Sequence, residues 1–282
     1  PGRTNRILQS HLSALRLNRQ LELDMEFLYT ADRERYRRMT TGELRDAYMI
    51  KDMFVSGEVS LTYTDVDRGI VGSAVPLEEV LALPIHKELA SDHFAQRREI
   101  GVINIGSAGS ISVDGETYPL DNRDSLYIGR GSKDVGFNSD SAADPAKFYF
   151  VSYPAHTAYP TKLVTKAEAN RLEMGSKEGC NERVIHQSIR PGIVDSCQIV
   201  LGFTELAPGS IWNTMPAHTH RRRTEIYMYF DVDESDCVFH FMGEPDETRS
   251  VVLRNGEAIV SPTWSMHSGA GTRNYTLSLI HI

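Results

Sequence analysis

Short runs of alternating apolar and polar residues fill most of the chain from Phe54 onward. The runs are rich in Val, Ile, Tyr, Phe and Thr, recur roughly every ten residues, and are separated by Gly, Asp, Asn and Pro. This spacing is typical of an all-β sandwich or barrel. The runs include 100–105, 109–113, 116–120 and 125–128, and later 198–204, 225–231, 236–242, 249–253 and 258–260. Asp114-Gly115 predicts a two-residue hairpin turn, because glycine tolerates a positive φ.

Two stretches depart from this pattern. From Thr30 to Met53 the apolar residues follow helical spacing, which predicts one or two short helices before the body of the chain. Residues 165–169 favour a short capped helix that acts as a connector. We therefore predict two barrels, an N-terminal one at 25–170 and a C-terminal one at 171–282. Residues 1–24 are interpreted as an upstream extension of the reading frame.

The composition is that of an ordinary globular protein. Of the 282 residues, 40% are hydrophobic and 24% charged, and the formal net charge is −8. This balance argues against nucleic-acid binding and favours a small-molecule partner. No run approaches the roughly 18 apolar residues of a membrane span. The three cysteines form no CxxC pair, so a reducing cytoplasm suits the chain.

The two halves carry related segments, which indicates a duplication. Residues 124–134 align with 257–267, and 97–100 with 223–226. This alignment gives Asp92, Phe94 and Asp134 at the positions of His218, His220 and His267. We therefore expect the N-terminal barrel to lack metal ligands.

The strongest chemical signal is a group of metal-ligand residue types in the second half. His218 and His220 lie two residues apart, so on a strand both imidazoles point to one face, and Glu225 follows beyond a turn. His267 follows a turn that begins at Pro262. A lone histidine is more often a core or surface residue, but this combination predicts a metal site. Three imidazoles and one carboxylate suit zinc, manganese, iron or nickel.

Four longer segments carry a resemblance to a known family. They are Arg97 to Gly106, Pro154 to Lys162, Leu206 to His220 and Ser261 to Gly269. The chain resembles the 5-keto-4-deoxyuronate isomerases, also called 4-deoxy-L-threo-5-hexosulose-uronate ketol-isomerases, of the cupin superfamily, over about residues 25–276. The resemblance implies two cupin-type jelly-roll barrels, one zinc per subunit, a cytoplasmic homohexamer and a role in pectin breakdown. The end of the chain, 277–282, does not match, so we expect a truncated C-terminal barrel.

The implied reaction is an aldose–ketose isomerisation, which moves a carbonyl from a terminal aldehyde to the adjacent carbon. The product would be 3-deoxy-D-glycero-2,5-hexodiulosonate. Strand parity places Tyr227 on the face of Glu225, and Thr214 on that of His218, while Thr204 lies on a nearby strand. These hydroxyls are candidates for binding substrate or relaying a proton, although a Thr or Tyr in a barrel is more often structural.

The substrate carboxylate calls for a cationic partner. Arg183, on the first strand of the C-terminal barrel, is the preferred candidate because a guanidinium binds a carboxylate through two parallel hydrogen bonds. Arg222 is nearer to the ligands in sequence, and His156 and Lys162 belong to a segment that matches the family. A solvated turn is the alternative explanation for Arg222, and packing or oligomer contacts explain His156 and Lys162 about as well.

Two other functions use the same ligands. A cupin dioxygenase would hold iron, and oxygen consumption distinguishes it from an isomerase. A noncatalytic sugar-acid-binding cupin would show no turnover. The long family-specific segments favour the isomerase.

Overall fold

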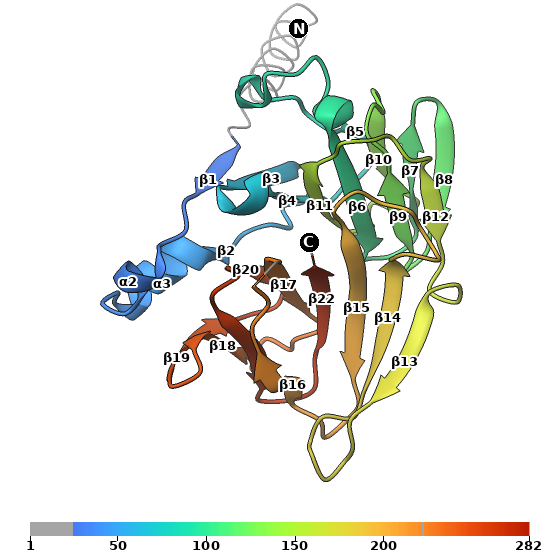
Figure 1. Cartoon of the computed structure of the whole chain (residues 1–282). Coiled ribbons are helices and arrows are strands. Elements are labelled where there is room, and N and C mark those ends of the chain that lie inside the picture. Colours follow the sequence, from blue (N-terminus) through green and yellow to red (C-terminus); the bar gives the residue numbers. More distant parts are fainter. Residues whose placement is uncertain (1–24, 222, 282) are drawn as a thin grey trace, which may run out of the picture.

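Regular structure in this protein is almost entirely β (Figure 1). The computed structural model describes residues 25–221 and 223–281. The segment 1–24 and Arg222, both of which carried predictions, lie outside the described residues. No helix in the described ranges is long and apolar enough to cross a membrane.

The first half of the chain forms a seven-stranded and a four-stranded sheet. The larger sheet has, in spatial order, β1 (Glu26–Leu28), β3 (Val59–Thr64), β4 (Ile70–Ala74), β11 (Phe148–Pro154), β6 (Arg98–Asn104), β9 (Ser125–Ile128) and β12 (Lys162–Val164). The smaller sheet has β5 (Leu81–Ala82), β10 (Val135–Ser139), β7 (Gly109–Val113) and β8 (Glu116–Leu120). Short 3-10 helices, η1 (Val66–Arg68), η2 (Lys87–Leu89) and η3 (Phe94–Arg97), lie between strands.

The second half repeats this arrangement. Its larger sheet has β13 (Asn170–Met174), β14 (Arg183–Ile189), β15 (Val200–Leu206), β22 (Thr276–His281), β17 (Glu225–Phe230), β20 (Glu257–Ser261) and β2 (Met49–Ile50). Its smaller sheet has β16 (Trp212–His218), β21 (Met266–Gly271), β18 (Val238–Glu244) and β19 (Glu247–Leu253). The central order β14-β15-β22-β17-β20 matches β3-β4-β11-β6-β9, which supports the predicted duplication.

Most predicted elements are confirmed. The runs 109–113, 116–120 and 125–128 are β7, β8 and β9, and the predicted hairpin has φ of 50° at Asp114 and 90° at Gly115. Two helices, α2 (Arg33–Tyr36) and α3 (Thr41–Tyr48), precede the barrels.

The predicted connecting helix at 165–169 is wrong. These residues form a single turn, in which the Glu168 carboxylate accepts hydrogen bonds from the backbone and hydroxyl of Thr165 at 2.9 Å each. The capping signal was therefore real, but β13 begins at Asn170 before a second turn can form.

The interior of the N-terminal barrel is filled with apolar side chains. Fully buried Ile100, Ile111 and Phe148 belong to this cluster, together with Val135. On β6, Ile100 pairs with the last residue of β9, as Glu225 on β17 pairs with the last residue of β20. Ile100, and not Glu99, is therefore the counterpart of Glu225, and the alignment of 97–100 with 223–226 is wrong by one residue.

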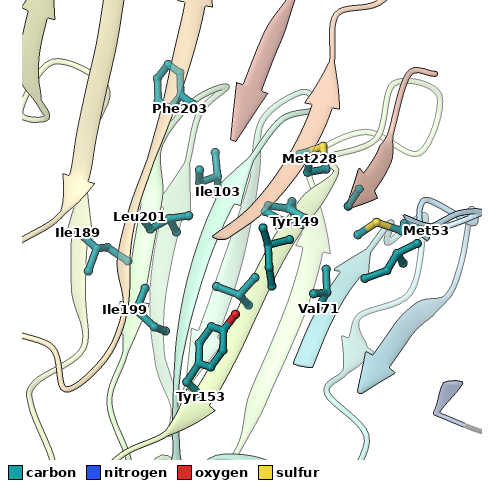
Figure 2. Packing of buried hydrophobic residues seen from close by; sticks show 14 of the residues in the cluster. Met53, Val71, Ile103, Tyr149, Tyr153, Ile189, Ile199, Leu201, Phe203 and Met228 are labelled. Carbon is teal, nitrogen blue, oxygen red and sulfur yellow. The ribbon is translucent and has the colours of Figure 1, made fainter. Parts of the chain in front are cut away.

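The outer faces of the two large sheets pack against each other (Figure 2). On β11, Tyr149 and Val151 face the other sheet, whereas Phe148 faces the interior of its own barrel. The opposing surface includes Leu201 and Phe203 of β15, so this sheet of the first barrel is buried on both sides. Burial of a large apolar side chain contributes roughly 1.5–3 kcal/mol.

Close approach of the two sheets requires a glycine on β6. A Cβ at Gly101 would lie 3.0 Å from side-chain atoms of Ile189 and Leu201 and 3.1 Å from Ile199. These contacts are tighter than ordinary van der Waals packing, so a larger residue would require the three side chains to shift by a few tenths of an ångström.

A buried carboxylate links the same two surfaces. Glu99 is fully buried and accepts hydrogen bonds from the backbone N–H groups of Cys197, Gln198 and Ile199 at 2.7, 2.6 and 2.9 Å. The Tyr127 hydroxyl donates a fourth at 2.8 Å. The carboxylate of one barrel thus fixes the loop that leads into β15 of the other.

The N-terminal segment packs on the second sheet pair. Tyr36, Leu44 and Tyr48 are buried with residues of the C-terminal barrel, and the Tyr36 hydroxyl donates to the Met242 carbonyl at 2.7 Å. Strand β2 pairs with β20. The stretch 31–50 therefore completes the core of the C-terminal barrel, although we had assigned it to the N-terminal one.

Glu99→Gln should destabilise the protein. The substitution removes the negative charge, and the new NH2 group would face backbone N–H groups that need an acceptor. We therefore expect the free energy of unfolding to fall by about 3 kcal/mol. Urea denaturation measures this change. Glu79→Gln, at an exposed position, is the matched control and should stay within about 0.5 kcal/mol of the parent. Equal stability of the two variants would contradict a linking role for Glu99.

Candidate metal centre

Strand ends bring four predicted ligand residues together in the C-terminal barrel. His218 is the last residue of β16, Glu225 is the first of β17, and His267 is the second of β21. His218 and His267 are direct cross-strand partners. His220 lies two residues past the end of β16, so our expectation that it shares a strand with His218 is wrong, although its imidazole reaches the same point.

The distances define a compact donor group. His218 Nε2 lies 3.0 Å from His220 Nε2, His220 Nε2 lies 2.9 Å from Glu225 Oε1, and His267 Nε2 lies 3.0 Å from Glu225 Oε2. One ligand atom from each of the three histidines lies within 4.8 Å of the others. Neighbouring donors around a tetrahedral ion with bonds near 2.0–2.1 Å are about 3.3 Å apart. The group therefore has the dimensions of a metal site.

Hydrogen bonding at Nδ1 directs the His218 Nε2 lone pair toward the donor group. Its Nδ1 lies 2.9 Å from the Pro216 carbonyl oxygen, which can only accept, so Nδ1 carries the proton. A carbonyl partner of this kind orients many metal-binding histidines. Burial lowers the pKa of His220 to about 4, which keeps this imidazole neutral at physiological pH. Neutral imidazoles are the form that binds a cation.

Access to this group is from one side only. His218 is exposed and His220 partly exposed, whereas Glu225 and His267 are 1% and 2% exposed. His218 and His220 therefore form the solvent-facing side of the donor group, and Glu225 and His267 form its barrel side.

A pair of hydroxyl groups adjoins the donor group. Tyr227 is fully buried, and its hydroxyl lies 2.9 Å from Thr214 Oγ1. Its ring centroid is 5.6 Å from that of His267. Burial, and next the negative charge of Glu225, raise the pKa of Tyr227 well above the ordinary value. The structure thus brings the hydroxyl groups of Thr214 and Tyr227 together.

Arg183 and Thr204 lie deeper in the same barrel. Thr204 is 1% exposed on β15. Arg183 is 6% exposed, and its Nε has no hydrogen-bond partner among the described residues. Burial lowers the pKa of Arg183, while Tyr275 and Tyr227 oppose this shift.

Two predicted substrate-binding residues lie elsewhere. His156 is exposed just beyond β11, and Lys162 begins β12 and donates to the Ile193 carbonyl at 2.6 Å. Within the described ranges, neither has a hydrogen bond or ion pair with the donor group. Arg222 lies outside the described residues.

Sequence reasoning missed His240. This histidine is fully buried on β18, and its Nδ1 lies 2.8 Å from the Tyr229 hydroxyl. Its ring centroid is 5.1 Å from that of Tyr227. The available signal was the alternation of Val238, His240 and Met242, which turns all three toward the barrel interior.

Two jelly-roll barrels, one of which carries a metal-compatible group of histidines at its mouth, define a bicupin. The chain belongs to the KduI/IolB family, whose sequence model matches residues 50–281. It is 51% identical over 252 residues to the 4-deoxy-L-threo-5-hexosulose-uronate ketol-isomerase of Lachnoclostridium phytofermentans, covering 89% of this chain and 91% of that protein. An enzyme of the same name from Escherichia coli O8 is 47% identical over 84% of this chain and 86% of that protein.

Solved structures show the same fold at low sequence identity. An IolB-like protein from Salmonella typhimurium LT2 has a TM-score of 0.61 and 13% identity, covering 76% of this chain and 82% of that one. The two-barrel architecture is therefore shared by proteins whose sequences have diverged widely.

His267→Ala should weaken binding of a divalent metal ion by about 100-fold or more, because it removes one donor of a compact set. Titration against a chromophoric chelator measures the affinity. His156→Ala, at an exposed histidine outside the group, should bind as the parent does. Parent-like affinity in His267→Ala would show that the ion binds elsewhere.

Proposed function

We propose that this protein is a zinc-dependent ketol-isomerase. It converts 4-deoxy-L-threo-5-hexosulose uronate to 3-deoxy-D-glycero-2,5-hexodiulosonate. The observation that carries the proposal is the convergence of three histidines and Glu225 beside the Tyr227–Thr214 pair, in a chain about half identical to relatives of that name.

We assign one zinc ion per chain to His218, His220, Glu225 and His267. A bound divalent cation supplies Lewis-acid stabilisation of the negative charge that develops when a proton leaves the carbon beside a carbonyl. Zinc suits the reaction because isomerisation requires no redox change. The nitrogen-rich donor set is also one that zinc favours over magnesium or calcium.

The reaction moves two protons. One passes from the hydroxyl-bearing carbon to the aldehyde carbon, and one from the hydroxyl oxygen to the former aldehyde oxygen. Tyr227 is protonated at physiological pH because burial raises its pKa, and its hydroxyl shares a hydrogen bond with Thr214 Oγ1. This pair is suited to exchange the oxygen-bound proton, and Thr204 extends the same polar wall.

Arg183 is our preferred partner for the substrate carboxylate. Its Nη1 donates to the Asn181 carbonyl at 2.9 Å, whereas its buried Nε lacks a hydrogen-bond partner in the described part of the chain. A buried N–H without a partner is costly unless a ligand completes it. Arg222, His156 and Lys162 remain alternative contributors, and the last two would act only across an assembly of subunits. We place this activity in a cytoplasmic homohexamer that takes part in pectin breakdown.

Turnover of the proposed substrate is the direct test. After metal removal and zinc add-back, the purified protein should convert 4-deoxy-L-threo-5-hexosulose uronate to the 2,5-diketo product, and His218→Ala should not. Product formation is followed by NMR under nitrogen and in air. Oxygen consumption would indicate a dioxygenase instead, and a folded, zinc-loaded protein without turnover would support a noncatalytic sugar-acid-binding cupin.

Tyr227→Phe should lower kcat while leaving zinc content unchanged. Loss of a positioned acid–base group reduces the rate by about 100-fold or more, whereas the ring that packs against His267 is retained. Thr214→Val removes only the hydrogen-bond partner and should lower kcat by a smaller factor. Steady-state kinetics with metal analysis measures both. Full activity of Tyr227→Phe would exclude its hydroxyl from the reaction.

A further inference from the structure

His240 has an unused hydrogen-bonding atom inside the metal-compatible barrel. Its Nδ1 is engaged by the Tyr229 hydroxyl at 2.8 Å, but its Nε2 is buried and has no hydrogen-bond partner among the described residues. Native proteins contain few such atoms, and each is explained by a water, an ion, a ligand or a functional role. The imidazole is neutral, because burial lowers its pKa to about 3.

The surroundings of His240 connect it to the donor group. Tyr227 packs against the His240 ring at 5.1 Å between centroids and against His267 at 5.6 Å. On the other side, the Tyr229 ring is 6.1 Å from that of Tyr227. His240 therefore belongs to the same interior wall as the hydroxyl of Tyr227.

A glycine on the neighbouring strand leaves space for the Tyr229 hydroxyl. A Cβ at Gly269, the cross-strand partner of His240, would lie 2.8 Å from the Tyr229 hydroxyl and 2.9 Å from that of Tyr275. The backbone of β21 thus leaves room for the group that holds His240, so the orientation of the ring is built into the sheet.

The duplicated barrel shows that the fold does not require a histidine here. Strand β7 corresponds to β18. The first residue of β7, Gly109, pairs with Leu120 and Ser139. The first residue of β18, Val238, pairs in the same way with Leu253 and Gly271. Counting along the strands, Ile111 corresponds to His240, and Val135 corresponds to His267 in place of Asp134, which the sequence alignment gave. Both Ile111 and Val135 are apolar residues of the first core. The barrel with the histidine donor group therefore has His240 at this position, whereas the N-terminal barrel has Ile111 there and Val135 at the position of His267.

We propose that His240 is a substrate-binding residue, whose Nε2 exchanges a hydrogen bond with a hydroxyl or carbonyl oxygen of the uronate chain while Tyr229 holds the ring. This inference rests on the proposed isomerase function. A purely structural His240 would serve only to satisfy the Tyr229 hydroxyl, and the two roles differ in what happens when both groups are removed together.

The decisive variant is the double substitution His240→Leu with Tyr229→Phe. Replacing both partners of a buried hydrogen bond by apolar groups of similar shape is nearly neutral or stabilising. We expect an unchanged or raised unfolding temperature and unchanged zinc content, together with a loss of about 100-fold in kcat/KM, the effect of removing one preorganised donor. The rise in unfolding temperature that the equilibrium mixture of substrate and product causes in the parent should also be reduced.

The matched control is His186→Leu. His186 is another buried histidine with one engaged nitrogen, 3.0 Å from Glu205 Oε2, and one nitrogen without a partner in the described ranges. Its ring stacks on Phe203 at 4.6 Å, on the side where the barrels meet. This variant should lose stability and keep kcat/KM within about threefold, because surface and core changes distant from the chemistry act mainly on folding.

The outcomes are distinguishable. An active parent with a stable, fully active double variant overturns the role of His240 and leaves the isomerase proposal intact. A double variant that loses stability and activity in parallel, as a structural residue would, also overturns it. A zinc-loaded parent without turnover overturns the proposed function, and the inference with it.

Discussion

The contact between the two large sheets is the constraint on which the molecule depends. Glu99 lies at its centre, where one carboxylate accepts three backbone N–H groups from the loop at 197–199. This loop leads into β15, which with β22 and β17 forms the wall of the C-terminal barrel. A buried charge is tolerated because all its bonds are made. Contacts with the first barrel therefore help to fix the position of Glu225 at the start of β17. The Thr224 hydroxyl adds a direct link between the barrels, because it donates a hydrogen bond to Asp67 at 2.6 Å.

The two barrels share strand order but differ in what they enclose. The first is filled with side chains such as Ile100, Ile111 and Val135, which contribute stability and leave no polar group to satisfy. The second encloses buried tyrosines, His240 and Arg183, several with polar atoms that lack protein partners in the described part of the chain. Buried polar atoms without partners reduce the stability of the barrel that encloses them. Packing against the N-terminal barrel, whose core is apolar, offsets that loss of stability.

Alternation and turn residues were sufficient to predict most strands, because they depend on neighbours in sequence. The spacing of His218, His220 and Glu225 likewise pointed to three of the four convergent residues, and the turn before His267 pointed to the fourth. Sequence reasoning failed where it depended on the exact register of a strand. The alignment of Glu99 with Glu225 is wrong by one residue, and a shift of one residue moves a side chain to the opposite face of the strand. His240 was missed because a single histidine in an alternating strand resembles any core residue. The partner of 31–50 was also beyond prediction, since β2 pairs with a strand about two hundred residues away.

The crossing of the N-terminal segment onto the C-terminal barrel has a consequence for biosynthesis. Tyr36, Leu44 and Tyr48 leave the ribosome before either barrel exists, yet their burial requires strands made near the end of translation. During that interval the side chains of Tyr36, Leu44 and Tyr48 lack their partners from the C-terminal barrel, while the strands of the first barrel are already available to fold. The stretch 31–50 can therefore be buried only after strands that are synthesised later have formed, and chain halves produced separately would each carry part of an unfinished core.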